Sequence, residues 1–192
     1  MVKKLLKLKK FREKTDAYKT EMEVMKAYKK FPKQIKNILK IEENYYKVKV
    51  AKNLYIKDKS CAGIIKTTIE EGTFVVVDRC IFIKERNKYE NYQFVEDVFY
   101  HECGHVLVIE AINNDMMKDE EFNFEFTGIF YEERENFIAY GNEIDEHFKN
   151  SNFEYFAQSF SEYLLKPERL KENTPKTYEF MDKFVNEILN RQ

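Results

Sequence analysis

Apolar residues recur at helical spacing near the start of the chain, where polar residues fill the positions between them. From about Thr15 to Lys40 they lie three or four residues apart, and Pro32 interrupts the run. The pattern predicts a helix that is broken near this proline. The residues of its apolar stripe are Met22, Met25, Ala27 and Tyr28.

The next part of the chain changes to short β-branched and aromatic stretches, which are typical of strands. Glu71 and Gly72 mark a turn between two of them. We expect four strands here and a small mixed or antiparallel sheet. The predicted strands are Tyr46–Ile56, Gly63–Ile69, Thr73–Val77 and Ile81–Ile83.

Helical periodicity returns near Tyr92 and continues to about Ala111. A polar, aromatic loop region is expected next, followed by two final helices. In the last one, Thr174 fits the N-cap and Pro175 the first helical position, and the apolar stripe predicts a helix that docks on the core. The stripe consists of Met181, Phe184, Val185 and Ile188.

The chain of 192 residues contains 3 prolines and 5 glycines, without a repeat or a linker. We therefore expect one α+β domain over residues 1–192, with the helix after Tyr92 at its centre and helices at its C-terminal end. Lys3 to Lys10 is locally basic, so residues 1–14 are expected to form a frayed helix end or a basic extension.

Charge is balanced, with 33 basic and 34 acidic residues. This balance argues against a nucleic-acid partner, and no apolar stretch is long enough to span a membrane. No secretory signal is visible, which predicts a cytoplasmic protein, or a secreted one if a leader was removed. Cys61, Cys80 and Cys103 are odd in number and widely spaced, which argues against a disulfide framework. Oligomeric state is not indicated.

Two of the three histidines stand in the segment His101-Glu102-Cys103-Gly104-His105. On a helix, positions i and i+4 share one face, so both imidazoles can hold one Zn²⁺ while the glutamate reaches a water molecule. The alternative is a pair of core histidines held by hydrogen bonds. Cys103 is turned away from both histidines and is expected to be a packed apolar residue. Gly104 lowers helix stability, which suggests that another element packs against the backbone there.

Catalytic zinc sites use three protein ligands, so a third must come from another segment. Glu154 lies in the first turn of a predicted amphipathic helix and is the preferred candidate, with Glu162 as the fallback. The competing interpretation is a capping box, in which Ser151 is the N-cap and Glu154 occupies the third helical position.

These motifs resemble the zinc-peptidase family of anthrax lethal factor and the Pro-Pro endopeptidases. The resemblance implies a zincin-type fold and a gluzincin-type peptidase, with His101, His105 and Glu154 as zinc ligands and Glu102 as the catalytic base. It is carried by the segments His101–His105, Glu154–Phe160 and Pro167–Phe180.

The sequence departs from this family at two positions. His147 stands where the family usually has a tyrosine that steadies the oxyanion, and an imidazole N–H can do the same. Tyr140 is the rival for this role, and a surface position for His147 is the remaining alternative. Gln158 replaces a glutamate near the metal, and its amide oxygen can still orient a ligand histidine.

The sequence thus predicts a zinc-dependent endopeptidase in which Glu102 takes a proton from water that attacks a peptide carbonyl. The expected partner is a protein or peptide substrate, extended along a sheet edge formed by Gly63–Ile69 or Thr73–Val77. The alternative is a catalytically weakened zinc-binding protein with an interaction or regulatory role on the same scaffold.

Overall fold

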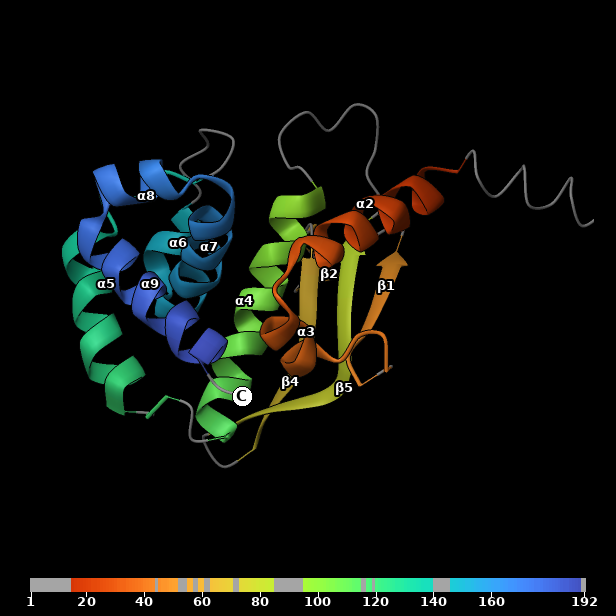
Figure 1. Cartoon of the computed structure of the whole chain (residues 1–192), viewed down its shortest axis with the longest axis horizontal. Helices are drawn as coiled ribbons and strands as arrows, with labels where there is room; N and C mark the ends of the chain where they lie inside the picture. Colours follow the sequence, from red (N-terminus) through yellow and green to blue (C-terminus); the bar gives the residue numbers. More distant parts are fainter. Residues whose placement is uncertain are drawn as a thin grey trace, which may run out of the picture.

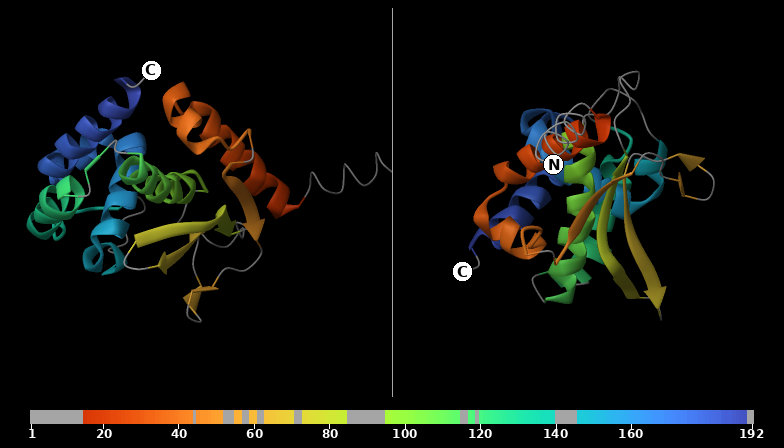
Figure 2. Two further views of the ribbon diagram at one scale, coloured as in Figure 1. Left: turned by 90° about the horizontal axis from the view of Figure 1, so that it is seen from below. Right: turned by 90° about the vertical axis from the view of Figure 1, so that its right-hand side faces the viewer.

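The computed structural model describes most of the chain and shows helices gathered over one face of a small sheet (Figure 1 and Figure 2). Described are residues 15–43, 45–51, 55–56, 59–60, 63–70, 73–84, 95–114, 117–118, 120–139 and 146–190. Residues 1–14, the turn at Glu71 and Gly72, and Tyr140 lie outside these ranges.

The first predicted helix is present and is divided at the proline, as expected. Helix α2 (Asp16–Lys30) begins at Thr15, whose side chain accepts a hydrogen bond from the Tyr18 N–H at 3.2 Å, and α3 (Lys33–Leu39) follows Pro32. The predicted apolar stripe was partly wrong. Ala27 and Tyr28 are buried with Thr20 and Val24, but Met22 and Met25 are 41% and 36% exposed. The buried face therefore lies to one side of the face that the methionines suggested.

The sheet is mixed and has the strand order β1-β5-β4. Strand β1 (Lys47–Ala51) runs parallel to β5 (Thr73–Lys84), while β4 (Gly63–Glu70) pairs antiparallel with β5. A separate short hairpin joins β2 (Tyr55–Ile56) to β3 (Lys59–Ser60).

The β region was predicted as strands, but their division differs from the expectation. Thr73–Val77 and Ile81–Ile83 are parts of one strand, β5, because its first half pairs with β4 and its second half pairs with both neighbours. Conversely, the stretch predicted as one strand over Tyr46–Ile56 contains both β1 and the short β2.

Helix α4 (Val95–Asn113) occupies the centre of the fold. It contacts α2, α3, β4, β5 and the C-terminal helix α7 (Asn152–Leu165), so nearly all of its faces are covered. Figure 2 shows the sheet and the C-terminal helices on different sides of α4. Side chains on this helix are therefore held in place by packing against the sheet and against the C-terminal helices.

The region predicted as a loop after α4 is largely helical, which corrects that expectation. A π-helical segment, η1 (Glu121–Phe126), continues into α5 (Thr127–Glu133), and the Thr127 N–H bonds to the carbonyl of Phe122. Phe122, Phe126 and Phe130 are buried and four residues apart. This aromatic spacing gives the segment an apolar face, which stabilises helix despite its polar composition.

Over the described residues 146–190 the chain forms four helices in place of the two expected. Helix α6 (Glu146–Asn150) precedes α7, and α8 (Pro167–Asn173) and α9 (Pro175–Asn190) follow it. As predicted, α9 docks through a buried apolar stripe and contacts α3, α5, α7 and α8.

The predicted start of α9 is confirmed, because the helix begins at Pro175, directly after Thr174. The Thr174 hydroxyl, however, donates backward to the carbonyl of Leu170 at 3.0 Å. The buried carboxylate of Glu133 instead accepts hydrogen bonds from the Lys176 and Thr177 N–H groups at 3.0 and 2.8 Å. A negative charge on α5 thus satisfies the first turn of α9.

The architecture is α+β, as the sequence predicted. None of the helices in the described ranges combines the length and apolar character needed to cross a bilayer. The core is shared by α4, the C-terminal helices and the inner face of the sheet, and its largest fully buried side chains include Phe99, Phe156 and Ile81.

Candidate metal centre

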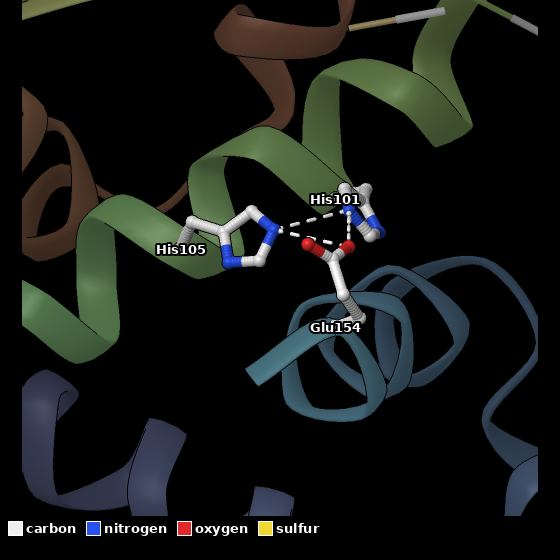
Figure 3. Close-up of side chains that lie close together, drawn as sticks. All are labelled: His101, His105 and Glu154. Carbon is white, nitrogen blue, oxygen red and sulfur yellow. Dashed lines mark hydrogen bonds and ion pairs between the residues drawn. The ribbon is translucent and has the colours of Figure 1, made fainter. Parts of the chain in front are cut away.

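Three side chains predicted as metal ligands converge between α4 and α7 (Figure 3). The Nε2 atoms of His101 and His105, one helical turn apart on α4, are separated by 3.2 Å. The Oε2 atom of Glu154, from the first turn of α7, lies 3.1 Å from His101 Nε2 and 3.5 Å from His105 Nε2. The sequence prediction that Glu154 joins the histidine pair agrees with this geometry.

Gly104 allows α7 to approach α4 closely enough for this convergence. A Cβ atom at this position would lie 2.9 Å from the Cα and 3.1 Å from the carbonyl oxygen of Ala157, and 3.2 Å from the Cβ of Phe160. These distances are shorter than ordinary van der Waals contacts, and the Ala157 atoms belong to a helical backbone. The expectation that another element packs against Gly104 is confirmed, and that element is the helix that carries Glu154.

Helix capping and a place in the cluster do not exclude each other at Glu154. Ser151 is the N-cap of α7, and its Oγ accepts a hydrogen bond from the backbone N–H of Glu154 at 3.4 Å. The Glu154 carboxylate meanwhile reaches both imidazoles. The fallback ligand Glu162 is placed elsewhere, because its fully buried carboxylate pairs with Arg169 at 2.5 Å.

The spacing of the three atoms fits a tetrahedral metal ion. Ligand atoms about 2.0–2.2 Å from such an ion lie about 3.3–3.6 Å from each other. The separations of 3.1, 3.2 and 3.5 Å are close to this edge length. All three side chains are largely buried, with exposed fractions of 13%, 15% and 24%. The two imidazoles and one carboxylate also match the donor set of catalytic zinc sites.

The protons available in the cluster also favour a cation. The Nδ1 of His101 lies 3.0 Å from the Oε1 of Gln158, which can only accept a hydrogen bond. A neutral His101 that donates there has a lone pair on Nε2, facing a carboxylate oxygen and a second imidazole nitrogen. Without a cation, the lone pairs of these atoms would repel one another, whereas a metal ion between them would attract all of them.

A buried polar network supports His101 from behind. The Nε2 of Gln158 donates to Oδ1 of Asp97 at 3.0 Å, and the hydroxyl of Ser161 donates to the same oxygen at 2.6 Å. Burial raises the pKa of the Asp97 carboxyl, and the hydrogen bonds from Ser161 and Gln158 oppose that rise. The amide oxygen of Gln158 lies 3.0 Å from Nδ1 of His101, so the predicted contact with a candidate ligand histidine is present.

Two carboxyl groups in the site have opposite pKa shifts. Burial raises the pKa of Glu102 to about 7, and the positive charge of a protonated His101 acts against this. Burial also acts to raise the pKa of Glu154, but in the metal-free protein the interactions with His101 and His105 outweigh it and hold that pKa well below its ordinary value. Glu154 is thus favoured as an anion, while Glu102 can exchange a proton near neutral pH.

The predicted oxyanion residues are only partly covered by the described structure. The backbone of His147 is part of α6, but its side chain is not described by the structure. Tyr140 lies entirely outside the described residues. The next residue of α6, Phe148, places its ring 5.8 Å from the ring of His101. Arg134 holds α6 by donating to the carbonyl of Lys149 at 3.0 Å. Helix α6 therefore lies beside the candidate metal centre.

The remaining predicted features of the motif agree with the structure. Cys103 is fully buried in the apolar core, outside the ligand cluster, and burial raises its pKa well above the ordinary value. Both Cys80 and Cys103 are free thiols, and Cys61 lies outside the described residues.

Sequence reasoning did not identify Asp97, Ser161 or Phe148 as parts of the site. A signal existed for Asp97, because it precedes His101 by four residues and so lies on the same helical face. No comparable signal existed for Phe148, whose position depends on how α6 is anchored to the turn after α5.

Comparison with known proteins gives a family assignment. The sequence family described as "Anthrax toxin lethal factor, N- and C-terminal domain" matches residues 9–184. The chain belongs to this family. Comparison with curated proteins found no match. The match includes α4, α6, α7 and the first ten of the sixteen residues of α9, so every residue of the candidate metal centre lies within it.

Proposed function

We propose that this lethal-factor-like protein is a zinc-dependent endopeptidase, with His101, His105 and Glu154 as ligands and Glu102 as general base. The observation that carries the proposal is the convergence of three ligand atoms from two helices at tetrahedral spacing. A buried glutamate follows the first ligand directly, with a pKa of about 7.

The side chains divide the chemistry between them. A zinc ion held by the three ligands supplies Lewis acidity, which polarises a carbonyl group and lowers the pKa of water. Glu102 takes a proton from the water that attacks the peptide carbonyl and transfers it to the leaving amine. Its raised pKa favours this exchange, because a base near neutrality both accepts and returns a proton.

The substrate proposed for this site is an extended peptide along β4. Of the two candidate edges, β5 is internal to the sheet and β4 is an outer strand. In Figure 1, β4 is the outer strand on the side of α4 and the C-terminal helices, whereas β1 is on the other side. A peptide that adds a strand to β4 would form main-chain hydrogen bonds beside the metal centre.

The oxyanion that forms during attack needs a donor opposite the metal ligands. His147 remains the first candidate, because α6 lies beside His101 through Phe148. Tyr140, seven residues earlier, remains the rival. Replacing each by phenylalanine and measuring kcat distinguishes them, since loss of the true donor lowers kcat by about 10²–10³-fold.

Metal analysis and a peptide-library digest test the proposed activity together. We expect about one zinc per wild-type chain, cleavage of a subset of peptides, and a Glu102→Gln variant that retains zinc but does not cleave. Wild-type-like cleavage by Glu102→Gln would refute the mechanism. Stoichiometric zinc without cleavage of any peptide would favour the alternative, a zinc-binding regulatory protein on a peptidase scaffold.

A further inference from the structure

Asp97 carries a buried carboxylate between α4 and α7, and Gln158 links it by hydrogen bonds to the candidate ligand His101. Asp97 is 5% exposed and lies one helical turn before His101. Its Oδ1 accepts hydrogen bonds from the Ser161 hydroxyl and from Nε2 of Gln158. Burying a carboxylate costs free energy unless hydrogen bonds or an opposite charge compensate for the lost water, so these two donors are needed to hold Asp97 in place.

The contact with Asp97 fixes which end of the Gln158 amide faces His101. An ionised carboxylate only accepts hydrogen bonds, so it selects the NH₂ end of the amide. Rotating the amide by half a turn would bring Oε1 against Asp97 Oδ1 at about the present 3.0 Å, where two acceptors repel. Gln158 is 3% exposed, so water cannot relieve that conflict.

The orientation of the amide then determines the proton position on His101. With Oε1 held 3.0 Å from Nδ1, the ring proton resides on Nδ1. The lone pair of the neutral ring is left on Nε2, the atom that lies 3.2 Å from His105 Nε2 and 3.1 Å from Glu154 Oε2. A ligand histidine needs this tautomer to bind metal through Nε2.

We propose that Asp97 is a positioning residue of the metal centre, which acts through Gln158 to keep His101 in its metal-binding tautomer. This rests on the metal site proposed above. Asp97 also places a carboxylate two hydrogen bonds from His101, through the neutral side chain of Gln158.

Zinc affinity, measured by competition with a chromophoric chelator, tests this role without reference to peptide cleavage. We expect Asp97→Ala to weaken zinc binding by about 10- to 100-fold, as is usual when an outer partner of a ligand histidine is lost. Asp97→Asn combined with Gln158→Glu exchanges the amide and the carboxylate between α4 and α7. The new amide on α4 then donates to the new carboxylate on α7, and this carboxylate still accepts the hydrogen bond from Nδ1 of His101. The double variant is expected to bind zinc within about threefold of the wild type.

Controls separate positioning from general stability. Glu133→Gln removes another buried carboxylate, which caps α9 through Lys176 and Thr177 and so joins α5 to α9 instead of α4 to α7. It should lower the unfolding midpoint of the metal-free protein and leave zinc affinity unchanged. Should Asp97→Ala not fold, the comparison of Asp97→Asn with the double variant decides, since the second should bind more tightly.

The outcomes are distinguishable from failure of the proposed function. If the wild-type chain binds no zinc, the metal site itself is refuted. If the wild type binds zinc, and Asp97→Ala changes the affinity by less than about twofold, the positioning role is refuted while the site stands. A double variant that binds no better than Asp97→Asn also overturns the role of Gln158 as the link.

Discussion

Replacing Gly104 by alanine should separate the α4–α7 contact from the rest of the fold. The new Cβ would lie 2.9 Å from Ala157 Cα, so α7 must move away by about 0.5 Å or more to reach an ordinary contact. Overpacking of this kind costs about 1–3 kcal/mol, while alanine gains about 1 kcal/mol of helix propensity over glycine. The net loss of stability is therefore small, about 1 kcal/mol.

The same displacement has a larger effect on metal binding. Glu154 precedes Ala157 by one turn on α7, so its Oε2 moves with that helix away from the two imidazoles. Metal–ligand distances tolerate about 0.2 Å, and we expect zinc affinity to fall by at least about tenfold. Chemical unfolding of the metal-free protein and chelator competition for zinc measure the two effects separately.

Gly128 provides the matched control, because a Cβ atom there meets nothing within 4 Å. Gly128→Ala lies in α5 and should stabilise the protein by up to about 1 kcal/mol without changing zinc affinity. The reasoning is refuted if Gly104→Ala binds zinc as tightly as the wild type, or if both glycine variants gain the same stability.

Three further predictions concern capping and pH. Ser151→Ala removes the N-cap of α7 and should lower the free energy of unfolding by about 1 kcal/mol, as measured by urea denaturation; an unchanged midpoint would contradict the cap. Glu133→Gln leaves a backbone N–H of α9 poorly paired and should cost about 1–3 kcal/mol in the same assay, whereas a neutral effect would show that α9 needs no cap from α5. Burial raises the pKa of Glu102 to about 7. Between the ordinary carboxyl pKa and neutrality, the folded metal-free protein therefore binds more protons than the unfolded chain. Its stability falls as the pH rises through this range. Glu102→Gln should therefore raise the unfolding midpoint at about pH 8 and lose this advantage at about pH 4; equal gains at both values would argue against the shift.

The three candidate ligands were predictable because they lie in segments with local signals. His101 and His105 share a helical face through their spacing alone, and Ser151 with Glu154 marks a helix start. Gly104, a residue that a helix interior disfavours, suggested that another element packs against α4 there, but the sequence did not indicate that this element is α7. Local periodicity was sufficient for these features.

Other features depend on contacts between distant segments, which periodicity does not encode. Asp97 and Ser161 meet only because α4 and α7 pack together, and the cap of α9 comes from Glu133 on α5 in place of the adjacent Thr174. The helical form of residues 121–133 was missed because Phe122, Phe126 and Phe130 lie among many polar residues. The buried face of α2 was misplaced because Met22 and Met25 are apolar but exposed.

Crystals of the zinc-loaded protein, measured on both sides of the zinc absorption edge, test the central claim most directly. The account predicts one anomalous peak between α4 and α7, about 2.0–2.2 Å from His101 Nε2, His105 Nε2 and Glu154 Oε2. A peak at another set of side chains, or none between these helices at full zinc loading, would contradict it.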